Sequence, residues 1–232
     1  MQHHRNLPIP DTLADVCDPD RMALLVYDMQ VGVVSQLADG PQVIGQVSRV
    51  LEAARRAGVR IFFTRHMTLP TELMGISQLR SAMAWQRKDR VEEVVSPFLR
   101  ESPGFGIVSE LAPSASEAVF DKLSLSAFEG TPLDFALRDA QVAAFAIVGV
   151  ATEVGIEPTV RHGADLGLIP VVVTDACGAG DHAAAKRCLD VLATAGDAIL
   201  TDIATITGLL ARPTMRQRGQ RGPEAAAEDA SR

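Results

Sequence analysis

The sequence predicts an α/β fold, a three-layer α/β/α sandwich around a central six-stranded, mainly parallel sheet. Short runs rich in β-branched residues recur along the chain, and stretches with helical periodicity separate them. The runs are apolar almost throughout, as expected for strands that are buried on both faces. Parallel neighbours of this kind need crossover connections, which supply the two outer layers. The expected strands are 23–28, 59–66, 117–122, 143–150, 169–175 and 197–202.

The stretches between these strands are expected to form the covering helices. One of them, 67–116, is too long for a simple crossover and contains several prolines. We expect it to form a helix and a loop that covers the active site. The remaining helices are expected over 42–57, 132–139, 156–166, 183–195 and 204–210.

The length of 232 residues fits one large α/β domain, which we assign to residues 1–211. Residues 212–232 are rich in Arg, Gln, Gly, Ala and Glu and lack apolar periodicity, so we expect a disordered tail. His3 and His4 are expected to belong to a loose N-terminus.

The composition limits the partners of the chain. Hydrophobic residues make up 47% and charged residues 22%, which is typical of a globular protein. The formal net charge of −7 repels a phosphate backbone, so we expect no nucleic-acid partner. No apolar run approaches the roughly 18 residues needed to span a bilayer, so we expect no membrane partner. The three cysteines are widely spaced and form no CxxC pair, which favours reduced thiols and a cytoplasmic location.

Several predicted strands end in a charged residue, and two of these residues, one acidic and one basic, are candidates for a pair. Asp28 closes the first strand in LLVYDMQ, and Lys122 closes the third in FDKLSLSAF. Because the carboxyl ends of parallel strands meet at one edge of a sheet, the two side chains can come together and shift each other's pKa. Taken singly, Asp28 is better explained as a capping or turn residue, and Lys122 is better explained as a solvated ammonium.

A third string, GVATEVGIEPT, runs from Gly149 to Thr159 across the end of the fourth strand and into a helix. Backbone N–H groups at a helix start are expected to be free to bind an anion or a developing oxyanion. Pro158 suits the first helical turn. Gly155 by itself is better explained as a residue that allows tight packing.

These three strings resemble the isochorismatase-like (cysteine hydrolase) superfamily in order and spacing, and the resemblance runs from about residue 21 to 202. It extends along the second and third strings, which continue as FDKLSLSAFEGTPL and GVATEVGIEPTVRHGADLG. The resemblance implies a proton-transfer role for Asp28 and an ionic partner in Lys122. It also implies a cis peptide between Val150 and Ala151. Amide-hydrolysing members have their cysteine nucleophile where this chain has Gly155.

The departure at Gly155 decides the expected chemistry, since glycine offers no thiolate for a thioester route. Isochorismatases proper are similar to this chain in carrying glycine there, and they cleave a vinyl ether by acid-catalysed hydration. We therefore predict that Asp28 is a general acid and Lys122 its partner. One tension follows, because a nearby ammonium lowers the pKa of a carboxyl group that must hold a proton.

The expected substrate is a small carboxylated molecule. Gln30, Arg65 and Trp85, together with the Val150–Ala151 peptide, are the candidate substrate-binding residues. Arg65 is a candidate because it lies near the tip of the second strand, where a guanidinium can bind the carboxylate of a substrate. Trp85 can equally lie between subunits.

No metal and no cofactor are expected. Nicotinamidases of the superfamily bind a metal after the second strand through an aspartate and histidines, whereas TRHMT offers only His66, which is more typical of a structural role. Cys177 lies at the same sheet edge, and such a cysteine is more often a small buried residue than a nucleophile.

Three functional hypotheses follow. The first is acid-catalysed hydrolysis without a cysteine. The second is an amidohydrolase that uses Cys177 or an activated water. The third is a catalytically silent binding or scaffold protein. We rank them in this order, and we expect the chain to form a homo-oligomer.

Overall fold

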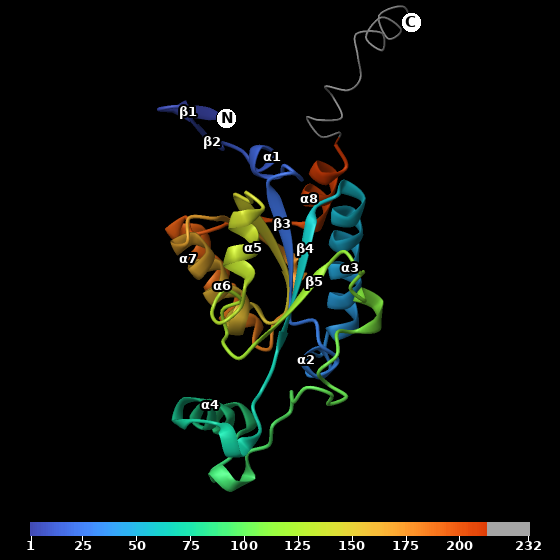
Figure 1. The fold of residues 1–232 in the computed structure, drawn as a ribbon, viewed down its shortest axis with the longest axis vertical. Coiled ribbons are helices and arrows are strands. Elements are labelled where there is room, and N and C mark those ends of the chain that lie inside the picture. The colour runs from blue at the N-terminus through green and yellow to red at the C-terminus, as the bar shows by residue number, and fades with distance from the viewer. Residues whose placement is uncertain (213–232) are drawn as a thin grey trace, which may run out of the picture.

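The computed structural model describes residues 1–212. Their main sheet has six strands, all parallel, in the spatial order β5-β4-β3-β6-β7-β8 (Figure 1). The predicted α/β sandwich and its parallel sheet are therefore confirmed. The strands are β3 (Met22–Tyr27), β4 (Arg60–His66), β5 (Ala118–Lys122), β6 (Ala144–Gly149), β7 (Ile169–Cys177) and β8 (Ile199–Thr201).

The sheet separates two hydrophobic cores, and β3 shows why. Side chains alternate between the faces of a strand. Leu24 and Val26 lie in one core, whereas Leu25 and Tyr27 lie in the other. Every residue of β3 is buried, as expected for a central strand that is covered on both sides.

Helices cover both faces of the sheet (Figure 1). On one side α3 and α8 pack against each other and against β7. On the other side lie α5, α6 and α7, whose buried residues belong to the core that contains Tyr27. The bounds are α3 (Gly40–Ala57), α5 (Leu133–Asp139), α6 (Glu157–Asp165), α7 (His182–Ala195) and α8 (Ile203–Leu210).

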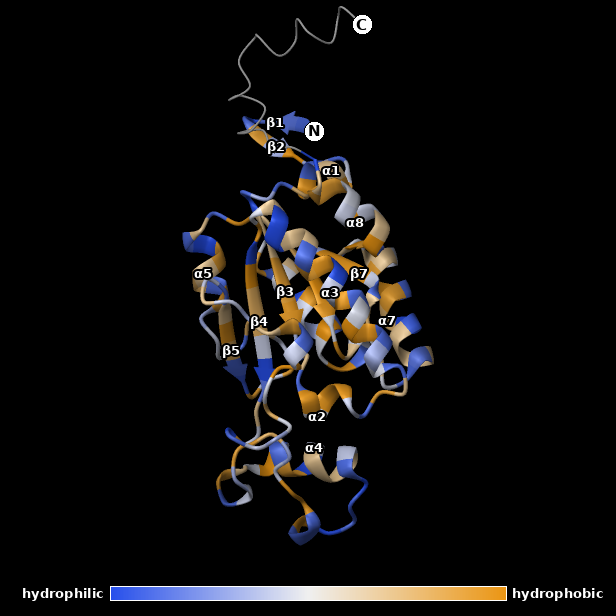
Figure 2. Cartoon of the chain, turned by 90° about the vertical axis from the view of Figure 1, so that its right-hand side faces the viewer, coloured by the Kyte–Doolittle hydropathy of each residue, from blue (hydrophilic) through white to orange (hydrophobic). Residues whose placement is uncertain are grey.

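The long stretch 67–116 contains a helix and loops, as predicted, and its first part lies beyond the carboxyl ends of the strands, whereas η3 (Ser109–Leu111) returns to pack against α3. Figures 1 and 2 show α4 (Ile76–Gln86) below that edge of the sheet. In Figure 2 the lower ends of β4 and β5 change from hydrophobic to hydrophilic, facing this segment. The segment also contains the short turns η1 (Thr71–Leu73) and η2 (Val91–Glu93).

The N-terminus differs from the expectation of a loose segment. β1 (Gln2–His4) and β2 (Leu7–Ile9) form an antiparallel hairpin. Arg5 and Asn6 form its turn with φ angles of 47° and 67°, the left-handed conformation that two-residue hairpins favour. Two short helices were also not predicted from the sequence, α1 (Leu13–Val16) and α2 (Val31–Val34).

Residues 213–232, most of the predicted tail, lie outside the described residues. The assignment of 1–211 to one domain stays a prediction, as does the homo-oligomer. Among the helices that the structure describes, none combines the length and the apolar character needed to cross a membrane.

Candidate active site

The site is built at the carboxyl ends of β3, β4 and β5. β4 lies between the other two strands. Asp28 follows β3 with a φ of 47°, a conformation uncommon for any residue other than glycine, and often found at functional sites. Lys122 ends β5, and its long side chain crosses beneath the end of β4 to reach the carboxylate.

Asp28 and Lys122 form a buried ion pair, as predicted. Lys122 Nζ donates to Asp28 Oδ2 at 2.7 Å. Both residues are buried, since Lys122 is 2% exposed and Asp28 is 5% exposed. The second carboxylate oxygen, Oδ1, accepts a hydrogen bond from the Thr64 hydroxyl at 2.7 Å. Lys122 also donates to the Tyr27 hydroxyl at 2.8 Å and to the Ser124 carbonyl at 3.2 Å, so all three ammonium hydrogens have an acceptor.

Burial and charge act against each other at this pair. Burial lowers the pKa of Lys122, because the charged form loses its hydration, while the Asp28 carboxylate opposes that change. His66 lies next to the pair at the end of β4. Burial and the nearby Lys122 ammonium lower its pKa, so its imidazole is neutral at pH 7.

The turn after β6 brings Gly155 to the pair. The peptide between Val150 and Ala151 is cis, as expected from the resemblance. A π-helical turn, η4 (Thr152–Ile156), then leads into α6 and leaves Gly155 buried. No sulfur atom can extend from this position, since glycine has no side chain.

The expected free N–H groups of this turn are not free. The amides of Val154, Gly155 and Ile156 all donate to the Ala151 carbonyl, at 3.3, 3.0 and 3.2 Å. The π-helical winding of η4 turns these donors back onto one acceptor. The prediction of an anion-binding helix start is therefore wrong for these three amides.

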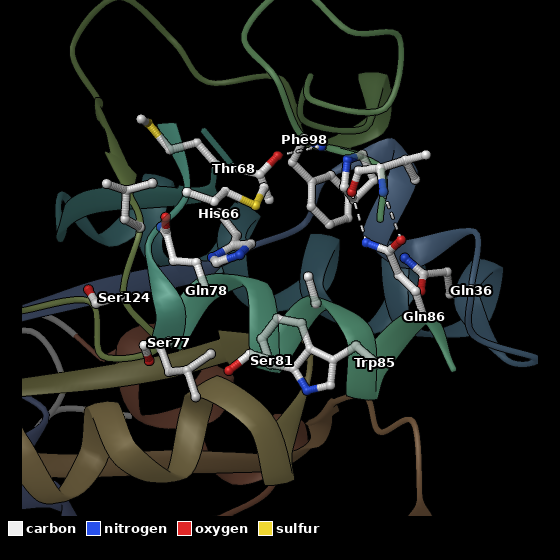
Figure 3. Close-up of a pocket in the computed structure, with 17 residues that line it drawn as sticks. Gln36, His66, Thr68, Ser77, Gln78, Ser81, Trp85, Gln86, Phe98 and Ser124 are labelled. Atoms are coloured by element: carbon white, nitrogen blue, oxygen red, sulfur yellow. Dashed lines mark hydrogen bonds between the residues drawn. The ribbon is translucent and has the colours of Figure 1, made fainter. Parts of the chain in front are cut away.

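Figure 3 shows a cavity of about 500 Å³ that is lined by His66 and Ser124 but by neither residue of the ion pair. The segment 123–125 separates the two, because its residues line the cavity while the Ser124 and Leu125 carbonyls bond Lys122 and Tyr27. His66 reaches the same cavity and meets Trp85 of α4 edge to face, with ring centroids 6.3 Å apart. Figure 3 also shows polar side chains around the cavity, including Thr68, Ser77, Gln78, Ser81, Gln86 and Ser124.

The other predicted substrate-binding residues have different places. Trp85 lines the cavity, one of the two places expected for it, and its role in substrate binding stays a prediction. Gln30 is fully buried, and its amide group bonds the backbone of His66 and Phe105, so it braces the loop. Arg65 does not line the cavity; its guanidinium pairs with Asp121 at 2.7 Å and stacks 4.4 Å from the centroid of the Phe105 ring.

Cys177 is unsuited to nucleophilic attack. Its thiol points at the Ile147 carbonyl at 3.7 Å, and burial raises its pKa to about 12. The reactive thiolate is therefore scarce at neutral pH. In residues 1–212 no group of three or more His, Cys, Asp or Glu residues is arranged to hold a metal ion; the expectation of a metal-free, cofactor-free enzyme stays a prediction.

Sequence reasoning missed the site roles of Tyr27, Thr64 and His66. Thr64 and His66 carry a detectable signal, since they are polar residues at alternate positions of a strand that is otherwise largely apolar, RIFFTRH. Tyr27 gives no such signal, because a tyrosine inside an apolar strand is expected to be a core residue.

The covered parallel sheet and the buried acid–base pair at its carboxyl edge define an α/β enzyme that acts on a small molecule. Residues 22–205 match the isochorismatase domain, and the chain belongs to this family of hydrolases. Its solved structural neighbours include a cysteine hydrolase from Pseudomonas syringae pv. phaseolicola 1448A, with a TM-score of 0.71, 24% identity, and coverage of 83% of this chain and 93% of that one. The nicotinamidase PncA from Bacillus subtilis shares the fold, with a TM-score of 0.65 and 15% identity over 78% of this chain and 99% of its own.

Among curated relatives, the ureidoacrylate amidohydrolase RutB of Serratia proteamaculans (strain 568) is 28% identical over 173 residues, which cover 68% of this chain and 70% of the relative. RutB of Enterobacter sp. (strain 638) is also 28% identical, over 74% of this chain and 81% of its own. This chain therefore shares its family and its hydrolase class with relatives that are named amidohydrolases, a name for enzymes that hydrolyse C–N bonds.

Proposed function

We propose that this protein hydrolyses a small molecule by acid catalysis, without a thiol nucleophile. The observation that carries the proposal is the buried Asp28–Lys122 pair, whose nitrogen and oxygen lie 2.7 Å apart beside a turn with glycine at position 155. An ion pair removed from water is a means of proton transfer at neutral pH. A covalent acyl-enzyme route has no nucleophile at this turn.

Cleavage of a vinyl ether is the first candidate reaction. The protonated carboxyl group of Asp28 gives its proton to the terminal vinyl carbon, and the ether carbon becomes an oxocarbenium ion. Water adds to that carbon, and a proton from the water returns to Asp28. The resulting hemiketal collapses to pyruvate and an alcohol. Lys122, fixed by its acceptors, orients the carboxyl group and stabilises negative charge on it.

This role requires a protonated Asp28 in the substrate complex. In the free enzyme Lys122 and Thr64 both donate hydrogen bonds to the carboxylate oxygens of Asp28. A substrate that presents its own partial negative charge to Asp28 favours the protonated form of the carboxyl group. The protonation state of Asp28 in the complex therefore depends on substrate binding as well as on the protein.

The cavity lining informs the rest of the substrate. Its side chains are apolar or are neutral hydrogen-bonding groups at pH 7, including the imidazole of His66. A carboxylate inside it would lack a cation, because Lys122 is held by Asp28 and Arg65 by Asp121. The lining supports a substrate with hydrogen-bonding groups on an apolar frame, and the carboxylate of an enolpyruvyl ether would be bound there by neutral donors such as Ser77 and Gln78.

Hydrolysis of a C–N bond by an activated water is the second candidate. The observation that favours it is the name of the relatives, ureidoacrylate amidohydrolase. In that reaction Asp28, as the carboxylate, removes a proton from the attacking water while the C–O bond forms, and gives this proton to the leaving nitrogen as the C–N bond breaks. Cys177 is a poor alternative nucleophile because the surrounding core raises the pKa of its thiol to about 12.

One assay panel separates the candidates. Purified enzyme is incubated with enolpyruvyl ethers and with ureido and carboxamide compounds, and pyruvate and ammonia are measured, before and after iodoacetamide treatment. We expect pyruvate release that persists after alkylation. Ammonia release that alkylation abolishes would overturn thiol-independent catalysis, and ammonia release that survives alkylation would favour the second candidate.

A further inference from the structure

The ring of Tyr27 fills the space into which a side chain at position 155 would extend. A β-carbon placed on Gly155 would lie 2.0 Å from the Tyr27 hydroxyl oxygen, 2.5 Å from Cζ and 2.6 Å from Cε1. Carbon atoms in favourable contact are separated by about 3.5–4.0 Å. A tyrosine at 27 and any side chain at 155 therefore exclude each other.

The ring has little freedom to move aside. Tyr27 is 2% exposed and lies on the central strand β3, within the core between the sheet and helices α5 to α7. Its hydroxyl accepts the Lys122 hydrogen bond at 2.8 Å and donates its own hydrogen to the Leu125 carbonyl. The Lys122 ammonium also lies 4.3 Å from the centroid of the ring.

The phenol differs from a thiol in its chemistry. Burial, and the neighbouring Asp28 carboxylate, raise the pKa of Tyr27 well above its usual value. The hydroxyl is therefore neutral at physiological pH and its hydrogen is already bonded to Leu125. Tyr27 can position Lys122, but it supplies no anionic nucleophile.

We propose that Tyr27 determines the reaction class of this site, by occupying the place of a nucleophilic side chain at position 155 and by holding the Lys122 ammonium against Asp28. Tyr27 is thus a specificity-determining and positioning residue. The catalytic meaning of this proposal rests on the proposed thiol-independent hydrolysis, whereas the steric exclusion between positions 27 and 155 does not.

The exclusion is tested by thermal unfolding, without any substrate. Gly155→Ala is made in three backgrounds: wild type, Tyr27→Phe, which keeps the ring, and Tyr27→Leu, which removes it. We expect Gly155→Ala to lower the Tm by about 5 °C or more, or to prevent folding, in the two backgrounds that keep the ring. In Tyr27→Leu the same change should cost at most about 2 °C. Equal losses in all three backgrounds would overturn the exclusion.

A second measurement tests whether a thiol at position 155 becomes reactive once the Tyr27 ring is removed. In Tyr27→Leu/Gly155→Cys, iodoacetamide alkylates the introduced thiolate, forming a sulfur–carbon bond and releasing iodide. Peptide mass spectrometry separates this site from Cys188, which serves as the internal control. We expect alkylation to titrate below the usual thiol pKa of about 8.5, and to return toward it when Lys122→Met is added. A thiol no more reactive than Cys188 would contradict the proposal.

The positioning role is tested with Tyr27→Phe, which removes one acceptor from Lys122 and keeps the ring. On whichever substrate the panel identifies, we expect kcat to fall about tenfold or more with KM little changed, and the pH–rate profile to shift. An unchanged kcat and pH profile would remove the positioning role. Because the unfolding and alkylation measurements need no turnover, they stand even if the proposed function fails.

Discussion

Thr64 and Asp28 bond each other twice. The Thr64 hydroxyl donates to Asp28 Oδ1 at 2.7 Å, and its oxygen accepts the Asp28 backbone N–H at 3.2 Å. Thr64 is fully buried and lies on the neighbouring strand β4. The two bonds hold both the carboxylate and the left-handed backbone of Asp28 in place, so the reactive group is oriented from the strand beside it.

This pairing makes Thr64→Val a sharp test, because valine keeps the shape of threonine and loses the hydroxyl. We expect the free energy of unfolding to fall by about 1.5–3 kcal/mol, since a hydrogen bond to a buried charged group is lost. Denaturant unfolding measures the loss. Thr64→Ser, which keeps the hydroxyl, is the control and should lose clearly less.

Asp28→Asn should abolish most turnover. The amide keeps the size of the side chain and one acceptor oxygen for Lys122, but it cannot deliver a proton. A loss of about 10²–10⁴-fold in kcat is expected for removing a general acid or base. Circular dichroism and the Tm check that the variant is folded. A folded Asp28→Asn enzyme with near-normal activity would rule out the proton-transfer role.

Stability should depend on pH through His66. Its pKa in the folded protein lies below the ordinary value of 6.5, because of burial and Lys122, so the unfolded chain takes up the proton first as the pH falls. The stabilisation is complete above pH 6.5 and is lost as the pH falls from there toward the lowered folded pKa.

Tm measurements in steps from pH 7.5 to about pH 5 follow this loss, since imidazole titrates in that range. His66→Gln should show a smaller decline over the same interval, because it removes the titrating group. His182→Gln, at the start of α7, is the matched control and should keep the wild-type slope. Equal slopes for wild type and His66→Gln would contradict this prediction.

Cys177 should be dispensable. Burial raises the pKa of its thiol to about 12, so Cys177→Ala is expected to keep near-normal kcat and KM. With limiting iodoacetamide at pH 7.5, mass spectrometry should find Cys188 labelled before Cys177. Loss of activity in step with labelling of Cys177 would revive it as a nucleophile.

Trp85 should report substrate binding. It is the single tryptophan of the chain, is 57% exposed and lines the cavity, so a bound ligand changes its surroundings. We expect a saturable change of fluorescence with substrate, and a KM about tenfold higher in Trp85→Ala, consistent with the loss of one aromatic contact. Phe135→Ala, at an exposed site 73% accessible on α5, is the control and should leave KM unchanged.

Comparison of particular elements shows how far the sequence leads. The apolar runs predicted that strands end at Asp28 and Lys122. Because the sheet was predicted to be parallel, both charged residues were expected at the same edge of it. The hairpin at Arg5 and Asn6 was not predicted, because Asn6 favours a left-handed turn but Arg5 does not, and the flanking strands are only three residues long. Arg65 was expected at the substrate, yet its partner Asp121 lies on β5, a strand that is distant in sequence and adjacent only in the folded sheet.

The sequence alone determined the alternation of apolar strands and helices, the charges at the strand ends and the absence of a side chain at Gly155, since each of these is a property of residue type and spacing. Only the tertiary structure decided that Tyr27 occupies the place beside Gly155, that the η4 amides are bonded and that Arg65 is paired. These are contacts between segments far apart along the chain, where van der Waals exclusion and hydrogen-bond satisfaction act through space.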